Sequence, residues 1–225
     1  MNNISVYYGY LLFTLILSSL ISYFSINKII SIGQKYNIQD FPNNRKIHKI
    51  PKVNLGGFAI LLGFITPILF LLFFETKNIN YAISTRNVVL ILLISVFIFA
   101  IGLWDDIKNL SPFSRLFFEF VLATLIFNAG IRIENIDFSF LKFDYIFLQL
   151  PYQLSFLITV FWIIAVINAI NWLDGLDGQL AINTIISSLT IIVLSIYFKN
   201  YSAGFFAASL MGACIGFLPK NLYPS

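Results

Sequence analysis

The sequence predicts an all-α polytopic membrane protein with about seven transmembrane helices. Of its 225 residues, 59% are hydrophobic and only 11% are charged, whereas soluble chains are roughly half apolar and about a quarter charged. The mean hydropathy is +0.87, and apolar runs approaching the roughly 20 residues of a spanning helix recur along the chain. These values exclude a soluble enzyme domain and a disordered chain. Because Cys214 is the only cysteine, they also exclude a secreted disulfide scaffold.

The apolar runs place the helices in order. The run from Gly9 to Ile26 has neither the basic start nor the cleavage site of a signal peptide, so it predicts a retained first helix. Six further runs predict helices at about 55–74, 87–104, 116–130, 152–170, 179–198 and 202–218. The fourth is short, and its helix is expected to begin nearer Pro112. No repeat or linker divides the chain, so one membrane domain is expected over residues 1–225.

The connections between these helices indicate the orientation. Nine of the 14 Lys and Arg residues lie in one alternate set of connections, and five lie in the opposite set. The positive-inside rule therefore places the first set in the cytoplasm and the N-terminus outside. The excess of basic residues in the cytoplasmic connections accounts for the net charge of +4, so this charge does not indicate a nucleic-acid partner, and none is expected. The outer connection 131–150 is polar and rich in β-forming residues, which predicts a short hairpin.

Two close pairs of aspartates fall on the predicted cytoplasmic side. Asp105 and Asp106 come at the C-terminal end of the third helix, where the helix dipole disfavours negative charge and adjacent carboxylates repel each other. Two interpretations carry equal weight here. The pair either begins a solvated loop with Lys108 and Arg115 as counter-charges, or it holds a divalent cation.

The second pair belongs to a longer polar pattern. Four polar residues recur every three positions across the end of the fifth helix: Asn168, Asn171, Asp174 and Asp177. This spacing keeps them on one slowly drifting face, and Gly175 and Gly178 permit tight turns beside it. Their oxygen atoms are ligands that Mg²⁺ prefers, commonly together with substrate phosphates. A helix cap would explain one such residue but not four, so a ligand site is favoured.

The first cytoplasmic connection supplies basic side chains. Arg45, Lys46 and His48 precede Gly56–Gly57, which open the next helix, and this combination suits a phosphate or diphosphate. Ordinary positive-inside charge is the alternative. His48, as a lone loop histidine, is not expected to be a metal ligand. In the fourth helix, Glu119 follows Arg115 by four residues, which predicts an ion pair between them.

Four segments together resemble a known family. They are DFPNNRKIHKIPKVNLGG, GLWDDIKNLSPFSRL, NAINWLDGLDG and GFLPKNLYPS. In this order and spacing the chain resembles, over essentially its whole length, the polyprenyl-phosphate N-acetylhexosamine-1-phosphate transferases, a membrane family also called glycosyltransferase family 4. The family includes WecA-type and MraY-type enzymes, and GLWDDIKNLSPFSRL is closer to the WecA-like branch.

The resemblance implies an activity. Such enzymes transfer a sugar-1-phosphate from a UDP-N-acetylhexosamine to undecaprenyl or another polyprenyl phosphate, release UMP, and initiate cell-envelope polysaccharides such as O-antigen. They use Mg²⁺, for which Mn²⁺ can substitute. The implied location is the bacterial cytoplasmic (inner) membrane with the active site facing the cytoplasm, and the implied assembly is a homodimer.

The resemblance also implies roles for individual residues. The catalytic residues would be Asp105, Asp106 and Asp174, and the metal ligands would be Asp177, Asp105 and Asp106. The substrates would be bound by Arg45, Lys46, His48, Asn168, Asn171 and Asp174. Relatives continue beyond the GFLPKNLYPS stretch into an MGD motif and a His-rich loop, and this chain stops at Ser225 before both. An N-terminal fragment of a longer gene product is therefore expected, with little or no activity of its own.

Three other functions compete with this prediction. Within the family, the alternative is an MraY-type phospho-N-acetylmuramoyl-pentapeptide transferase. Outside it, the alternatives are a transporter, because intramembrane carboxylates often mark ion paths, and an inactive membrane scaffold. Transporter sites usually lie near the bilayer midplane, whereas these aspartates are predicted at helix ends.

Overall fold

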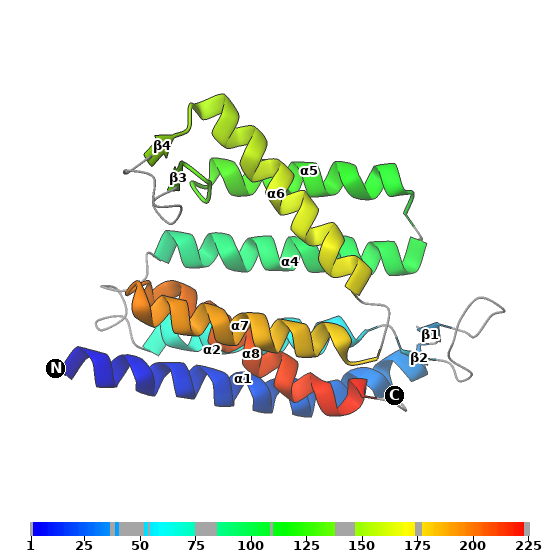
Figure 1. Ribbon diagram of the computed structural model, residues 1–225. Coiled ribbons are helices and arrows are strands. Elements are labelled where there is room, and N and C mark those ends of the chain that lie inside the picture. The colour runs from blue at the N-terminus through cyan, green and yellow to red at the C-terminus, as the bar shows by residue number, and fades with distance from the viewer. Residues whose placement is uncertain are drawn as a thin grey trace. The chain divides into compact units, whose positions relative to one another are not determined.

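The computed structural model describes residues 2–36, 39–40, 52–53, 55–74, 85–108, 110–137, 147–173 and 177–222, and they form a predominantly helical chain (Figure 1). The helices are α1 (Asn2–Lys35), α2 (Gly56–Phe74), α4 (Thr85–Lys108), α5 (Pro112–Asn128), α6 (Tyr152–Leu173), α7 (Gln179–Tyr197) and α8 (Tyr201–Asn221). The strands are β1 (Gln39–Asp40), β2 (Lys52–Val53), β3 (Asn135–Asp137) and β4 (Phe147–Gln149). Each of the predicted helices is present.

Length and composition identify the membrane helices. Within the described residues, six helices are long and apolar enough to cross a bilayer. The exception is α5, which has 17 residues and begins at Pro112, as predicted. Its start has a local cause: the Ser111 side chain caps the helix by accepting the Ser114 N–H at 3.2 Å, and Pro112 has the fixed φ that suits a first helical position. The chain is an all-α polytopic membrane protein, and this prediction is confirmed.

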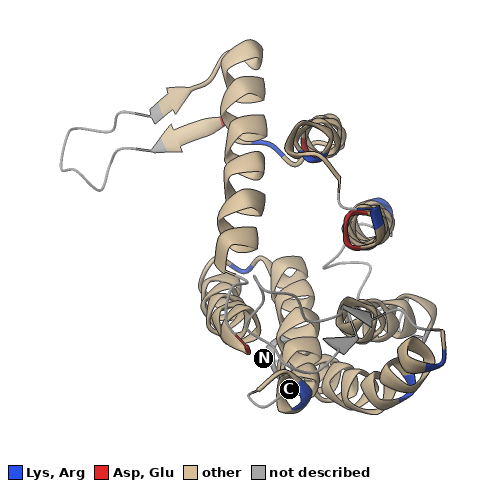
Figure 2. Cartoon of the chain, turned by 90° about the vertical axis from the view of Figure 1, so that its right-hand side faces the viewer, with Lys and Arg blue, Asp and Glu red and all other residues tan. Residues whose placement is uncertain are grey.

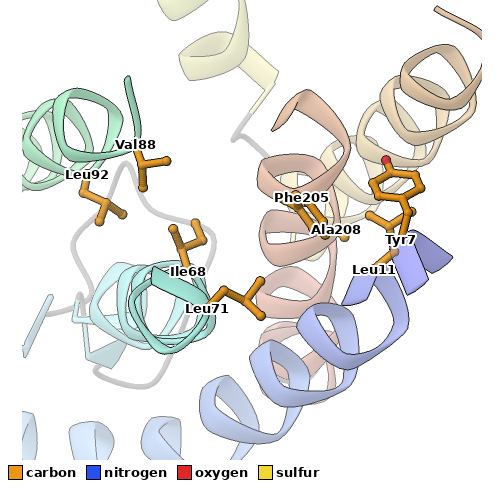
Figure 3. Packing of buried hydrophobic residues seen from close by; sticks show 8 residues of the cluster. All are labelled: Tyr7, Leu11, Ile68, Leu71, Val88, Leu92, Phe205 and Ala208. Atoms are coloured by element: carbon orange, nitrogen blue, oxygen red, sulfur yellow. The ribbon is translucent and has the colours of Figure 1, made fainter. Parts of the chain in front are cut away.

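The chain forms two compact units. The first contains Met1–Phe99 and Asp174–Ser225, and the second contains Ala100–Leu173. In the first unit, side chains from α1, α2, α8 and the first turns of α4 form an apolar cluster (Figure 3). Its buried members are Tyr7, Leu11, Ile68, Leu71, Val88, Leu92, Phe205 and Ala208. The single membrane domain expected from the sequence stays a prediction.

Small residues bring α1 and α8 into close contact in the first unit. Thr14, Ser18 and Ser22 follow one another at four-residue intervals on α1, and all three are fully buried. On α8, Gly212 and Gly216 face this stripe, and the Ser18 hydroxyl donates to the Ser209 carbonyl at 2.5 Å. Close backbone approach of small residues is the common means of packing helices in lipid, where the hydrophobic effect does not drive association.

The second unit contains α5, α6 and the predicted hairpin. Strands β3 and β4 pair antiparallel, with Ile136 opposite Leu148, so the hairpin predicted within 131–150 is confirmed. The chain leading into β3 is fastened to α6 through Ile133, whose N–H donates to the Thr159 hydroxyl at 3.0 Å and whose carbonyl accepts from the Ser155 hydroxyl at 2.6 Å. These bonds satisfy backbone groups where the helix pair meets the hairpin.

Candidate functional site

The Asp105 carboxylate closes the corner between α4 and α5. Asp105 and Asp106 lie in the last turn of α4, slightly inside the helix and not after it, because α4 continues to Lys108. Asp105 Oδ1 accepts the Leu110 N–H at 3.0 Å, and Oδ2 pairs with Arg115 Nη2 at 2.9 Å. The Asp105–Arg115 ion pair thus joins the end of α4 to the first turn of α5. Figure 2 marks the acidic residues of the described chain in red and the basic residues in blue. The cation compensates a carboxylate that the α4 dipole disfavours.

The two aspartates of this pair have different surroundings. The Asp105 side chain is 22% exposed and engaged with Arg115, whereas Asp106 is exposed. Arg115 is thus a counter-charge for the pair, as one of the two sequence interpretations expected. Exposed carboxylate oxygens at Asp106 suit the other interpretation, a hard divalent cation.

The predicted ion pair between Arg115 and Glu119 is wrong. Arg115 binds Asp105, and the buried Glu119 accepts a hydrogen bond from Asn168 Nδ2 on α6 at 2.6 Å. The i,i+4 rule describes side chains on an exposed helix. Glu119 instead lies on the buried face of α5 with Leu122 and Phe127, where α6 supplies its hydrogen-bond donor.

The pattern around the end of α6 is split between the two units. Asn168 and Asn171 belong to α6, with Asn168 half-buried and Asn171 exposed, and both lie in the second unit. Asp174 lies outside the described residues. Asp177 belongs to the first unit and is exposed in the turn that leads into α7.

Gly178 explains how the chain turns after Asp177. Its φ is +76°, in the left-handed region that favours glycine, and it forms the N-cap of α7. A Cβ at this position would also lie 2.9 Å from the Leu222 side chain. The glycine predicted to permit a tight turn therefore does so, and it fixes where Asp177 is presented relative to α7.

Exposed tryptophans mark the same helix ends as the acidic residues. Trp104, 48% exposed, directly precedes Asp105 on α4, and Trp172, 86% exposed, occupies the last turn of α6. Tryptophan side chains concentrate at the membrane–water boundary. The carboxylates of Asp105 and Asp106 thus lie beside a residue suited to that boundary, away from the middle of a spanning helix.

The basic residues predicted to bind phosphate, Arg45, Lys46 and His48, lie outside the described residues. Antiparallel pairing of β1 with β2, with Asp40 opposite Lys52, brackets the segment that carries them. The sequence did not reveal this pairing, because strands of two residues leave no alternating pattern.

The exposed carboxylates of Asp106 and Asp177 are of the chemical type that binds Mg²⁺. Among the residues with described positions, no group of three or more His, Cys, Asp or Glu side chains is gathered to hold a metal. Asp106 and Asp177 nevertheless each present an exposed carboxylate beside a helix terminus. Mg²⁺ needs no all-protein cage, since it is usually held by one or two carboxylates together with substrate phosphates and waters.

Replacing Arg115 with Met is expected to lower the free energy of unfolding by about 1–2 kcal/mol, between the values for exposed and buried ion pairs. The pair is partly shielded, with 36% and 22% exposure of its two side chains. Thermal unfolding in detergent micelles measures the change. Lys108→Met is the control, because Lys108 is exposed at the same helix end and forms no described ion pair. Equal stability of the two variants would show that the Asp105–Arg115 contact contributes nothing.

The fold is that of a polytopic membrane protein with acidic residues at helix ends, and comparison with known proteins shows its family. Residues 88–225, more than half of the chain, match the family model described as "Glycosyl transferase family 4", and the chain belongs to this family. The resemblance inferred from the four sequence segments is confirmed.

The chain is also similar to individual proteins of this family. The chain is 28% identical over 92% of its length to the probable undecaprenyl-phosphate N-acetylglucosaminyl 1-phosphate transferase of Bacillus subtilis (strain 168), of which it covers 54%. It is 24% identical over 92% of its length to a decaprenyl-phosphate N-acetylglucosaminephosphotransferase of Mycobacterium tuberculosis, of which it covers 52%. A phospho-N-acetylmuramoyl-pentapeptide-transferase of Staphylococcus saprophyticus is 27% identical over 76% of the chain, which covers 54% of that protein. The chain thus spans about half the length of these curated relatives.

Proposed function

We propose that the protein transfers an N-acetylhexosamine-1-phosphate from a UDP-sugar to a polyprenyl phosphate such as undecaprenyl phosphate, with release of UMP. Membership in glycosyl transferase family 4 and the names of the relatives support this activity. The structural observation that carries it is the acidic pair at the end of α4, with Asp105 held by Arg115 and Asp106 exposed beside it. Exposed carboxylates near helix ends suit cation-assisted phosphate chemistry better than a path through the membrane.

The acidic residues of the chain would have two roles, one structural and one in binding the metal. Arg115 and the Leu110 N–H fix the Asp105 side chain, which in turn holds the end of α4 that presents Asp106. By the family resemblance, Asp105, Asp106 and Asp177 are each predicted ligands of Mg²⁺, or of Mn²⁺ in its place. The bound ion would supply positive charge that offsets repulsion between the two anionic substrates and stabilises the leaving phosphate.

Other predicted residues would bind the substrates. Asn171 and Asp174 would hold the nucleotide, and Arg45, Lys46 and His48 would lie near substrate phosphates, where cations offset the negative charge. The proposed location is the bacterial cytoplasmic membrane with these groups on the cytoplasmic side, in keeping with the excess of basic residues in the connections around them. A homodimer stays a prediction.

The test is exchange of labelled UMP into a UDP-N-acetylhexosamine by membranes that carry the protein, expressed from its complete reading frame. Exchange is expected to require both Mg²⁺ and polyprenyl phosphate, because labelled UMP can enter the UDP-sugar only when the transfer to the lipid phosphate runs in reverse. Membranes without the protein are the control. No exchange with any UDP-N-acetylhexosamine, under conditions in which the protein is folded, would refute the proposal.

The relative from Staphylococcus saprophyticus favours one second candidate, transfer of phospho-N-acetylmuramoyl-pentapeptide. The same assay separates the two functions when UDP-N-acetylglucosamine and UDP-N-acetylmuramoyl-pentapeptide are offered in parallel. Exchange with the pentapeptide substrate alone would select the second candidate.

A further inference from the structure

A buried carboxyl group on α5 is coupled to the polar pattern at the end of α6. Glu119 is 6% exposed on a helix that is otherwise mostly apolar. Its described hydrogen bond comes from Asn168 Nδ2 at 2.6 Å, and Arg115, one turn away, pairs with Asp105 instead. Burying a carboxyl group without a cation is costly, and ionisable residues within membrane segments are rare and usually functional.

The two acceptors around Asn168 determine the orientation of its amide. The side-chain nitrogen donates to Glu119 Oε2 at 2.6 Å and to the Ile164 carbonyl at 3.0 Å. An amide NH₂ has two hydrogens, so this pair of bonds uses both of them. The flipped orientation would turn the amide oxygen toward the Ile164 carbonyl, an acceptor that cannot donate, and is therefore excluded.

The orientation restricts what Asn168 can offer to a ligand. With both hydrogens used, the amide oxygen Oδ1 remains, and it is an acceptor and a hard metal ligand. Such an atom can receive an N–H or O–H of a nucleotide or sugar, but it cannot donate to a phosphate oxygen. Asn168 is half-buried and lies one helical turn before Asn171, which is exposed on the same helix.

We propose that Glu119 is a positioning residue for binding of the UDP-sugar: its buried carboxyl group holds the Asn168 amide so that Oδ1 is presented to an N–H or O–H group of that substrate. This inference rests on the proposed transferase function. Glu119 itself touches no substrate, so its removal should change recognition of the nucleotide sugar and leave recognition of the lipid phosphate unchanged.

The experiment compares three variants in membranes that carry the complete protein, with UMP exchange as the readout. Glu119→Leu removes the acceptor and is expected to raise KM for the UDP-sugar about tenfold to hundredfold. Losses of this size are typical when a side chain that orients a ligand-binding residue is removed, as at metal sites. KM for polyprenyl phosphate should stay within about twofold. Glu119→Gln keeps an acceptor oxygen for Asn168 Nδ2 and should retain nearly full activity.

Leu122→Ala is the matched control for packing. Leu122 is 3% exposed on the same face of α5, so its truncation loosens the contact with α6 without removing the acceptor of Asn168. It should lower thermal stability while leaving the ratio of the two KM values unchanged. The same KM shift in Leu122→Ala as in Glu119→Leu would overturn the positioning role.

Exchanging the donor and the acceptor between residues 119 and 168 provides a second test in case Glu119→Leu does not fold. Asn168→Asp places a carboxylate against that of Glu119 and should raise KM for the UDP-sugar, because like charges at hydrogen-bond distance repel. Adding Glu119→Gln restores a donor between the helices and should recover at least about fivefold of the loss. No recovery, in protein whose wild type exchanges UMP, would refute the inference alone. No exchange by the wild type would refute the proposed function and the inference with it.

Discussion

Gly216→Ala is expected to lower the free energy of unfolding by about 3 kcal/mol or more, because the added methyl group has no space. A Cβ at Gly216 would collide with the Ser19 carbonyl oxygen and lie 2.9 Å from both the Ser22 Cβ and the Tyr23 backbone nitrogen. Two of these three neighbours are backbone atoms of α1, which cannot rotate aside as a side chain can. The fraction of monodisperse protein after a heating series in detergent measures the loss.

Gly9→Ala on α1 is the matched control for Gly216→Ala. No atom lies within 4 Å of a Cβ built at Gly9, so the substitution introduces no contact. Its stability should equal that of the wild type or exceed it by up to about 1 kcal/mol, since alanine restricts the unfolded chain. Equal thermal stability of the two variants would contradict the close packing of α8 on α1.

Asp106→Asn and Asp177→Asn are each expected to lower UMP exchange at least about hundredfold, as the loss of one group that stabilises developing charge commonly does. The amide keeps the size of the carboxylate but removes the charge with which it would hold Mg²⁺. Both side chains are exposed, so folding should be unaffected. Rates at several Mg²⁺ concentrations, measured beside thermal stability, separate loss of metal affinity from loss of structure.

Glu134→Gln is the control for these two aspartates. Glu134 is an exposed acidic residue that pairs with Arg132 beside the β3–β4 hairpin, at the opposite end of α5 from Asp105. Its exchange rate should stay within about twofold of the wild type. Full activity in both aspartate variants would remove Asp106 and Asp177 from the site and leave Asp105 as the remaining predicted metal ligand.

The apolar runs predicted the helices because each membrane helix must keep roughly 20 apolar residues within the bilayer. Their ends were harder to predict, since polar residues can continue a helix. Asp105 and Asp106 lie within α4, where Arg115 and the Leu110 N–H compensate the charge of Asp105 at an unfavourable helix end. The C-terminal position of the pair was predicted, and Arg115 was one of its two expected counter-charges, but the hydrogen bond from the Leu110 N–H was not predicted.

The i,i+4 spacing within α5 predicted the wrong pairing for Arg115 and Glu119. The i,i+4 relation joins residues on one helix, whereas packing against α6 offers Glu119 the amide of Asn168, 49 residues away. The turn between α4 and α5 gives Arg115 the Asp105 carboxylate in the same way. Which partner a side chain binds depends on which helix faces pack together, and a local sequence pattern does not contain that information.

One packing feature could have been predicted but was missed. Gly212 and Gly216 form a GxxxG motif in an apolar segment, and Ser18 and Ser22 repeat the same four-residue spacing on α1. Both are signatures of closely packed membrane helices.

The length of α1 links this packing to the thickness of the surrounding lipid. Its candidate span, Tyr7–Lys35, has 29 residues and is about 43 Å long, whereas the hydrocarbon layer is about 30 Å thick. The helix must therefore tilt or extend its end turns into the headgroup layer. Because Gly212 and Gly216 hold α8 against the α1 backbone, the two helices must tilt together. Any tilt that the bilayer imposes on α1 is thus shared by α8, the last helix that the described chain contains.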